Sequence, residues 1–257
     1  MITITDENLK FYRENGYHIF HEQLLPAAKF AGLKSFFEQL LADLPEGKRP
    51  EAMDVPHFRF PQLLEWLLAD EVLDVVERML GPDLILWSSH FICKPDGDGQ
   101  AVPWHEDSAY WGGRLEPHEV MTIWLAIDDS TVENGCMRVI ARSHDNGFSD
   151  YEPVDATTNV FATQVVEEQL DLSRAVDLEI KSGECHVHHA KIIHGSNANH
   201  SDQRRCGYTM RYMPASVKFT PDGRHTHGIY LARGRDLAGN TYLDSDKPLP
   251  EILQRRW

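Results

Sequence analysis

The chain has 257 residues, of which 42% are hydrophobic and 10% aromatic, enough to build one domain over residues 1–257 with a sizeable core. Forty acidic and 25 basic side chains give a net charge of −15, which disfavours nucleic acids and anionic membranes as partners because both repel an acidic protein. No apolar run approaches the roughly 18 residues that a membrane span needs. No basic leader precedes a small-residue cleavage site, so the cytoplasm is the expected compartment, and the four cysteines, which form no C-x-x-C pair, are expected to be reduced.

The first third of the chain carries helical signals. Residues 5–16 fit a helix with Thr5 or Asp6 as its N-cap and Gly16 just past its end, followed by a short apolar strand, HIF. Two longer segments, AAKFAGLKSFFEQLLADL and LEWLLADEVLDVVERMLG, place apolar residues at helical spacing. We therefore expect an N-terminal helical region over about residues 1–81.

After Pro82 the pattern changes to short strands. The segments rich in β-branched and aromatic residues are DLILWSSHFICK, EVMTIWLAID, MRVIARS, VDLEIKSG, ECHVHHAKIIHG and RCGYTMRYM. Most of them lack a helix-length connector to the next, which disfavours a parallel α/β sheet. The sequence predicts a mainly β fold, a jelly roll or similar double-sheet barrel, over about residues 82–215. The polar stretch from Asp145 to Glu179 is expected to be a loop over a pocket, and the C-terminal segment is expected to be irregular.

The segment WHEDSAYW, residues 104–111, contains His105 and Asp107 two positions apart. On a strand these side chains point to the same side, and a late strand returned beside them would add His194 from KIIHGS. Two histidines and one carboxylate on one face of a metal suit non-haem Fe(II) and its chemistry with O2. The H-x-D spacing alone is common, so a surface hydrogen bond is the alternative interpretation.

Three blocks in this order resemble the phytanoyl-CoA dioxygenase (PhyH-like) family of Fe(II)/2-oxoglutarate oxygenases. They are WHEDSAYW, IWLAIDDSTVENGCMRVIARSH and IIHGSNANHSDQRRCGYTMRY, within about residues 84–213. The family's usual GSH appears here as Arg142-Ser143-His144. The resemblance implies a cupin-like double-stranded β-helix with Fe(II), 2-oxoglutarate and O2 as cofactors. It also implies that the metal ligands, and thus the catalytic centre, are His105, Asp107 and His194.

The same resemblance implies a site for the cosubstrate. The family places an arginine eleven residues after the distal histidine, which selects Arg205 over its neighbour Arg204. A planar guanidinium meets the C5 carboxylate of 2-oxoglutarate with two parallel hydrogen bonds. Ser196 would add a hydroxyl to that carboxylate, and Thr122 and Trp124 would lie along the cosubstrate pocket.

The resemblance implies an oxygenase that acts on a small molecule. Halogenating relatives replace the metal-binding carboxylate by a small residue, so the retained Asp107 favours hydroxylation of a small polar metabolite, with release of succinate and CO2, by a monomer or homodimer. A desaturase or cyclase would share every site residue. A cupin-type metal isomerase would use His186 and His188, which share a strand face, and would not need Arg205. A non-catalytic binding domain would keep the fold without turnover.

A few further residues bear on the substrate pocket. Tyr110 and Trp111 directly follow the proposed ligands and are candidates for pocket walls, whereas Trp87 is expected in the core, as is usual for aromatic residues in barrel strands. Arg211 is a possible partner for an anionic substrate group, although a surface or structural charge is the simpler interpretation. His227 lies in a Gly- and Asp-rich turn and is expected to be solvated.

Overall fold

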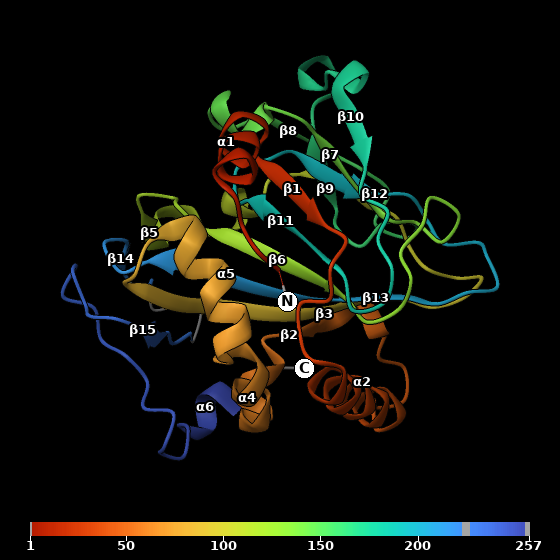
Figure 1. Cartoon of the computed structure of the whole chain (residues 1–257). Helices are drawn as coiled ribbons and strands as arrows, with labels where there is room; N and C mark the ends of the chain where they lie inside the picture. The colour runs from red at the N-terminus through yellow and green to blue at the C-terminus, as the bar shows by residue number, and fades with distance from the viewer. Residues whose placement is uncertain (1, 223–226, 255–257) are drawn as a thin grey trace.

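Two antiparallel sheets lie one above the other in the computed structural model, which describes residues 2–222 and 227–254 (Figure 1). The large sheet has the order β1-β11-β6-β13-β3-β15, with β2 also paired to β3, and the small sheet has the order β10-β7-β12-β4. The predicted mainly β, jelly-roll fold with helices packed on it is confirmed.

The strands of the large sheet are β1 (Tyr17–Phe20), β2 (Met53–Asp54), β3 (Leu84–Lys94), β6 (Met121–Ala126), β11 (Cys185–His189), β13 (Arg205–Pro214) and β15 (Tyr230–Arg233). Those of the small sheet are β4 (Val102–His105), β7 (Met137–Ile140), β10 (Ala175–Asp177) and β12 (His194–Ser196). Two further pairs join β5 (Leu115–Glu116) to β14 (Lys218–Phe219) and β8 (Tyr151–Pro153) to β9 (Thr163–Val165). The helices are α1 (Asp6–Asn15), α2 (Ala27–Ala42), α3 (Pro56–Arg59), α4 (Leu64–Leu67), α5 (Asp70–Leu80) and α6 (Glu251–Gln254).

The N-terminal helices follow the predicted signals with one exception. Thr5 caps α1 by accepting a hydrogen bond from the backbone N–H of Asn8, and Gly16 ends the helix in the left-handed conformation, with φ of 80°. The segment LEWLLADEVLDVVERMLG forms two helices because Ala69 is extended, with ψ of 137°. This break leaves Asp70 and Glu71 in the first turn of α5, where the helix dipole favours acidic side chains.

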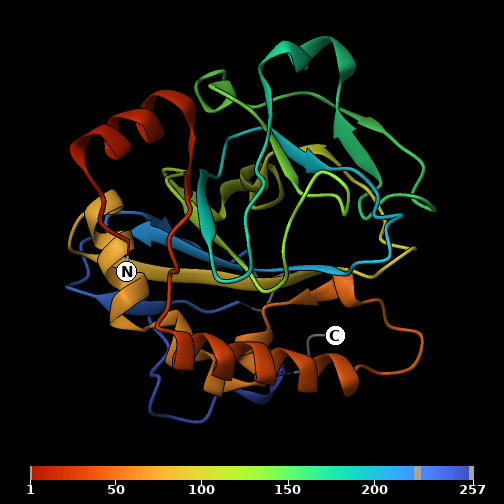
Figure 2. The ribbon, with the colours of Figure 1, turned by 45° about the vertical axis from the view of Figure 1, so that its right-hand side comes forward.

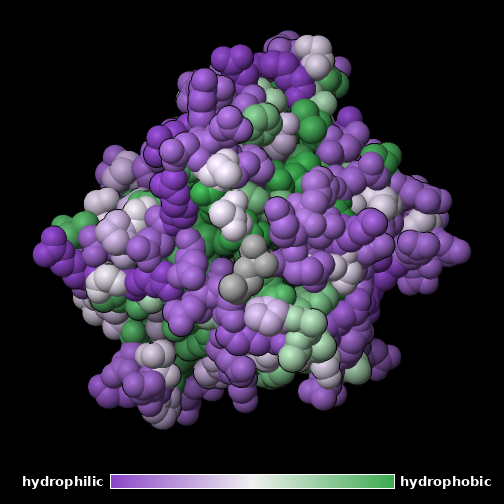
Figure 3. Space-filling view, in the orientation of Figure 1, coloured by the Kyte–Doolittle hydropathy of each residue, from purple (hydrophilic) through white to green (hydrophobic). Residues whose placement is uncertain are grey.

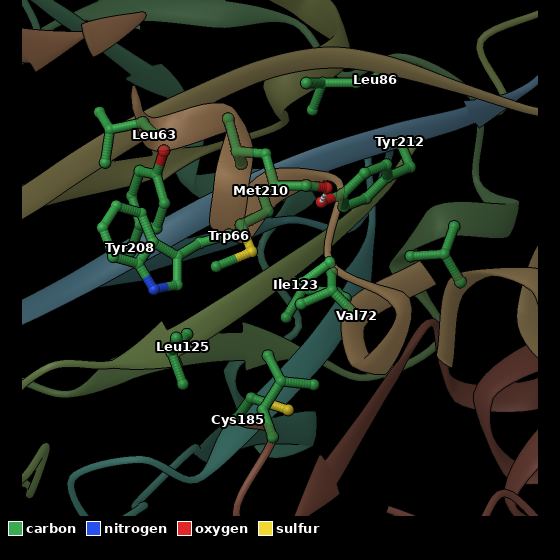
Figure 4. Packing of buried hydrophobic residues seen from close by; sticks show 14 of the residues in the cluster. Leu63, Trp66, Val72, Leu86, Ile123, Leu125, Cys185, Tyr208, Met210 and Tyr212 are labelled. Carbon is green, nitrogen blue, oxygen red and sulfur yellow. Dashed lines mark hydrogen bonds between the residues drawn. The ribbon is translucent and has the colours of Figure 1, made fainter. Parts of the chain in front are cut away.

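The two faces of the large sheet have different chemistry because side chains alternate along each strand. Apolar side chains on the outer face pack against α2, α4 and α5, which lie on the side away from the small sheet (Figure 2). Figure 4 shows this contact, in which Ile123, Met210 and Tyr212 lie beside Trp66 and Val72. The inner face carries histidine, threonine, serine and arginine side chains and therefore supplies the polar groups of the site described below.

The large sheet extends beyond the predicted core of residues 82–215. Residues 17–20 form the edge strand β1 on β11, and residues 230–233 form β15 on β3, so the segment after residue 215 is not wholly irregular. Of VDLEIKSG, only Val176 and Asp177 belong to a strand, β10. Edge strands are short and are hydrogen-bonded on one side only, so their sequence signal is weak.

The exterior agrees with the acidic, polar composition. Figure 3 shows hydrophilic side chains over most of one face, with apolar residues between them. No helix in the described part of the chain is long and apolar enough to cross a membrane. All four cysteines are free and buried, as expected.

Candidate active site

His105 and His194 are directly opposite each other on neighbouring strands of the small sheet. Asp107 begins a 3-10 turn, Asp107–Tyr110, two residues after β4 ends, rather than continuing the strand. Its Oδ1 atom lies 3.9 Å from Nε2 of each histidine. One potential ligand atom of each residue lies within 4.8 Å of those of the other two residues. All three side chains are buried. The structure thus brings the three predicted ligands together, and their metal-binding role stays a prediction.

Both histidines are oriented and neutral in the way that a metal requires. Nδ1 of His105 lies 2.9 Å from the carbonyl oxygen of Pro103, and Nδ1 of His194 lies 2.9 Å from that of Ile192. Because only a protonated Nδ1 can donate to a carbonyl, Nε2 keeps its lone pair toward Asp107. Burial, together with His194, lowers the pKa of His105 to about 3, and burial also lowers the pKa of His194. This donor set fits a divalent transition metal.

Asp107 is held by an arginine from the large sheet. Nε of Arg211 donates to Oδ2 of Asp107 at 3.0 Å, and its Nη2 lies 3.4 Å from Oδ1. Burial alone would raise the pKa of Asp107, but Arg211 and the nearby histidines outweigh burial and hold this pKa well below its ordinary value. Asp107 is therefore an ionised carboxylate despite its burial.

The HVHH histidines lie beside this centre rather than in it. His186 stacks on the ring of Trp124, with ring centroids 5.3 Å apart. His188 Nε2 lies 4.0 Å from Oδ2 of Asp107, whereas His105 and His194 lie nearest Oδ1, and the His188 ring centroid is 5.0 Å from that of His194. Within the described ranges, the group with metal-like spacing contains neither residue. The structure therefore gives no support to a three-histidine cupin site.

Two buried cations lie next to each other on the inner face of the large sheet. Arg205, 2% exposed, donates to the carbonyl oxygens of Gly135 and Ile92, and its Nη2 lies 3.4 Å from Oγ of Ser196. Lys94 is its partner in strand register, is fully buried, and donates to the carbonyl oxygen of Asn197 at 2.8 Å. Neither cation forms a salt bridge with a carboxylate among the described residues. An anion bound beside them would supply the missing counter-charge.

The other predicted cosubstrate residues have different positions. Trp124 and Ser196 line the same cavity as Arg205, whose guanidinium lies 5.4 Å from the Trp124 ring centroid. The Trp124 ring fits there because residue 207 is glycine: a Cβ at Gly207 would lie 2.0 Å from it. Thr122 is buried, but it is not among the residues that line the cavity, and its hydroxyl has no partner in the described part of the structure. Its cosubstrate role stays a prediction.

Arg204 points away from the site, as the predicted register requires. Its guanidinium donates to Glu38 and to Asp128, and it lies 5.1 Å from the ring centroid of Phe37 on α2. These contacts join β13 to the outer helix layer. Only Arg205 of the two arginines lines the cavity.

Two cavities meet at Asp107. The inner cavity, about 90 Å³, is bounded by the proposed metal ligands and the two buried cations. The outer cavity, about 490 Å³, is walled in part by Tyr110 and Trp111, as predicted, and by Trp87. Residues common to both cavities are Glu51, His90, Asp107, Val160, Phe161 and Arg211. Val160 and Phe161 belong to the polar segment that was expected to cover a pocket.

A family model provides the decisive comparison. The model described as phytanoyl-CoA dioxygenase (PhyH) matches residues 12–207, about three quarters of the chain. The chain belongs to the PhyH family. Its three-residue cluster and Arg205 both fall within this match.

Relatives and solved structures agree with this assignment. The PhyH chain is 28% identical over 169 residues to a probable alpha-ketoglutarate-dependent hypophosphite dioxygenase of Stutzerimonas stutzeri, covering 63% of this chain and 56% of that protein. It spans about half the length of most of the curated relatives it matches. Among solved structures, the apo form of the non-heme monooxygenase ThoJ is 26% identical, with a TM-score of 0.72 and coverage of 91% and 86%. The alpha ketoglutarate dependent carbocyclase SnoK shares the fold at 22% identity, with a TM-score of 0.68 and coverage of 86% and 88%.

Several residues of this PhyH site were not predicted from the sequence. Lys94, Glu51 and His90 all line the inner cavity. The alternation Ser88, His90, Ile92, Lys94 in DLILWSSHFICK is the signal that places two of them on the inner face. The expectation that His227 is solvated was wrong, because its ring packs 4.1 Å from the ring centroid of Trp87 and its Nε2 donates to the Trp87 carbonyl oxygen.

Proposed function

We propose that this protein is an Fe(II)- and 2-oxoglutarate-dependent oxygenase that hydroxylates a small polar metabolite. The observation that carries the proposal is the inner cavity, where a buried His-Asp-His cluster lies in one small space with Arg205, a buried cation that has no carboxylate partner among the described residues. A metal-holding cupin would need only the cluster. A cosubstrate with two carboxylates, one at the metal and one distant from it, accounts for both features.

The residues divide into two groups with separate roles. His105, Asp107 and His194 would hold Fe(II) through two Nε2 atoms and Oδ1. Arg205, with Ser196 and Lys94 beside it, would bind the C5 carboxylate of 2-oxoglutarate. Charge-assisted hydrogen bonds in a buried site are stronger than those in water, so these groups would fix the orientation of the cosubstrate.

The apolar residues of the cavity would keep water away from the reacting atoms. Trp124 and Met137 wall the inner cavity, and Val160 and Phe161 stand between it and the outer cavity. When bound, Fe(II) and 2-oxoglutarate use O2 to place one oxygen atom in a substrate C–H bond and the other in succinate, with loss of CO2. The chain contributes ligation, positioning and exclusion of water to this chemistry.

The direct test measures succinate. Purified protein with Fe(II), ascorbate and 2-oxoglutarate is screened against a metabolite library for stimulated succinate release, and stimulated samples are analysed for a product with one added oxygen atom. The Asp107→Gly variant is the control, because it lacks one ligand and keeps Arg205. Absence of 2-oxoglutarate binding by the Mn(II)-loaded wild type, measured by isothermal titration, would disprove the proposal.

A cyclase or desaturase is the second candidate, and one structural relative supports it. The fold is shared with a protein described as a carbocyclase, and such reactions use the same ligands and cosubstrate. The product distinguishes the two candidates, since cyclisation or desaturation removes two hydrogen atoms and adds no oxygen. A mass increase of one oxygen atom supports hydroxylation.

A further inference from the structure

The outer cavity contains a polar end built from two strands of the large sheet. Ser88 on β3 and Arg211 on β13 are partners in strand register, both are buried, and both line this cavity. Directly opposing residues of an antiparallel pair point to the same face. The Ser88 and Arg211 side chains therefore leave the sheet side by side and line the same cavity, and the Arg211 guanidinium reaches Asp107.

A β-bulge at Trp87 adds an apolar wall beside these polar groups. Arg211 pairs with Ser88 and Tyr212 pairs with Leu86, so Trp87 is the extra residue of β3. Bulges redirect side chains near functional sites. The Trp87 ring meets Trp111 edge-on, with centroids 5.8 Å apart, and both rings line the outer cavity. One region of the cavity thus combines hydrogen-bond donors with aromatic surface.

Arg211 keeps donors available after it has bound Asp107. A guanidinium carries five N–H donors. Arg211 makes hydrogen bonds through Nε and Nη2 to Asp107 and through Nη1 to Oγ1 of Thr209. Two N–H groups, one on each Nη atom, remain without a partner in the described structure. Two N–H groups at the end of a guanidinium match the two oxygens of a carboxylate.

The buried charges around the loaded centre also favour an anion. Three buried basic side chains line the two cavities, Arg205, Lys94 and Arg211. Two buried carboxylates line them, Asp107 and Glu51, and Glu51 already has Arg49 as a bidentate partner, at 2.8 and 3.2 Å. A third, Glu106, lies outside both cavities and is bound by Ser149 and Tyr151. The charges of a divalent metal and of the 2-oxoglutarate dianion cancel. Among the buried side chains that line the cavities, two arginines therefore accompany one carboxylate without a further partner, Asp107, whether or not Lys94 carries its proton, and a bound anion would balance the second arginine.

We propose that the outer cavity binds a small metabolite with one anionic group, a carboxylate or similar oxyanion. Arg211 and Ser88 hold the oxyanion, and the apolar part of the metabolite lies against Trp87 and Trp111. This assignment rests on the proposed function and specifies the substrate class of the same site. The opposite side of the cavity carries Asp54, whose Oδ1 lies 3.7 Å from Nδ1 of His90. This acidic side makes a cationic substrate the specific alternative.

The test compares three probes of similar size and different charge: phenylacetate, phenylacetamide and phenethylammonium. Each is titrated into protein loaded with Mn(II) and saturated with 2-oxoglutarate, and the relaxation of probe protons by Mn(II) reports binding near the metal. Zn(II)-loaded protein gives the diamagnetic reference. We expect phenylacetate to bind at least about tenfold more tightly than either other probe. Equal or tighter binding of phenethylammonium would overturn the proposal.

Two serines provide matched variants. Ser88→Ala removes a hydroxyl at the proposed anion site without touching Asp107, and it should reduce the preference for phenylacetate over phenylacetamide several-fold. Ser89→Ala changes the neighbouring residue, whose hydroxyl contacts Nδ1 of His57 at 2.7 Å, and should leave the preference unchanged. An unchanged preference in Ser88→Ala contradicts the assignment. Binding of 2-oxoglutarate is measured first: its absence refutes the proposed function, whereas its presence without charge discrimination refutes only the substrate class.

Discussion

Arg211 binds Oδ2 of Asp107 more closely than Oδ1, the oxygen that lies nearest the two histidines. Its Nε lies 3.0 Å from Oδ2, whereas Oδ1 lies 3.9 Å from Nε2 of both His105 and His194. The carboxylate is thereby oriented before any metal arrives. The same contact compensates the buried negative charge of Asp107 in the metal-free protein. The stability of the fold therefore depends on Arg211.

We predict that Arg211→Gln destabilises the metal-free protein by about 3 to 5 kcal/mol, because it leaves the Asp107 carboxylate buried without its cation. If Mn(II) binds to the same carboxylate, as the ligand assignment predicts, saturating Mn(II) should recover part of this loss. Urea unfolding with and without Mn(II) measures both effects. Arg204→Gln is the control: its ion pairs are partly exposed, so we expect a loss of no more than about 1 kcal/mol. Equal losses in the two variants would contradict the role of Arg211.

The pH dependence of this contribution follows from the lowered pKa of Asp107. The unfolded carboxyl titrates near pH 4, and the folded one at lower pH. The stabilisation is therefore fully present above about pH 4 and is lost as the pH falls through the folded pKa. Arg211→Gln should reduce the slope of stability against pH in the acid range relative to the wild type.

The ligand assignment predicts which variants lose metal. His105→Ala and His194→Ala each remove an Nε2 donor and should weaken Mn(II) binding at least about a hundredfold, with unchanged circular dichroism. His188→Ala is the matched control on β11 of the large sheet, and we expect Mn(II) affinity within about tenfold of the wild type. A His188→Ala variant that binds no Mn(II) would move the site toward the HVHH histidines.

Much of the site was predictable because its residues are close in sequence or follow strand alternation. His105 and Asp107 are two positions apart, and the family spacing from His194 selects Arg205, whose neighbour Arg204 falls on the opposite face. His194 was predicted because a barrel can return a late strand beside an early one, and the family resemblance implied the same residue. In the structure, β12 pairs directly with β4 and places His194 opposite His105.

The unpredicted features depend on contacts between distant segments. Glu51 reaches the cavity from a 3-10 turn in the N-terminal region, and no local pattern places it there. Trp87 faces the outer cavity because of a bulge whose register depends on β13. Arg211 was interpreted as a surface or structural charge because its partner, Asp107, lies 104 residues earlier in the chain. Tertiary pairing, rather than local propensity, decides these positions.

We predict that Lys94 takes up a proton when 2-oxoglutarate binds. Burial, together with the nearby Arg205, lowers the pKa of Lys94 to about 6. The unfolded pKa is about 10.4, so between these values the unfolded chain binds a proton that the folded chain does not, and stability falls as the pH decreases through this window. A dicarboxylate bound beside Lys94 should raise this pKa and bring in about one proton at about pH 8.

Titration calorimetry of 2-oxoglutarate in buffers of different ionisation enthalpy measures that uptake. We expect it in the Mn(II)-loaded wild type and not in Lys94→Met, which should also be more stable than the wild type at about pH 8 without ligand. Lys34→Met is the control, because Lys34 lies at the surface 3.4 Å from Asp128. Proton uptake that persists in Lys94→Met would assign it to another group.

The arginine pair provides the most direct test of the cosubstrate site. Arg205 is buried with three neutral partners and no carboxylate among the described residues, whereas Arg204 already binds Glu38 and Asp128 outside the cavity. Truncating one partner of a buried charged pair costs about 2 to 5 kcal/mol. At about 1.4 kcal/mol per factor of ten, Arg205→Ala should weaken 2-oxoglutarate binding about 30-fold to 3,000-fold.

The series Arg205→Ala, Arg205→Lys and Arg204→Ala separates geometry from charge. Arg205→Lys should be intermediate, because an ammonium restores the charge without the planar fork. Arg204→Ala should change 2-oxoglutarate affinity little, although it removes ion pairs to the outer helix layer. Isothermal titration of the Mn(II)-loaded variants with 2-oxoglutarate measures these affinities. Wild-type affinity in Arg205→Ala would show that the cosubstrate carboxylate binds elsewhere, and a large loss confined to Arg204→Ala would show that β13 presents the opposite face to the cavity.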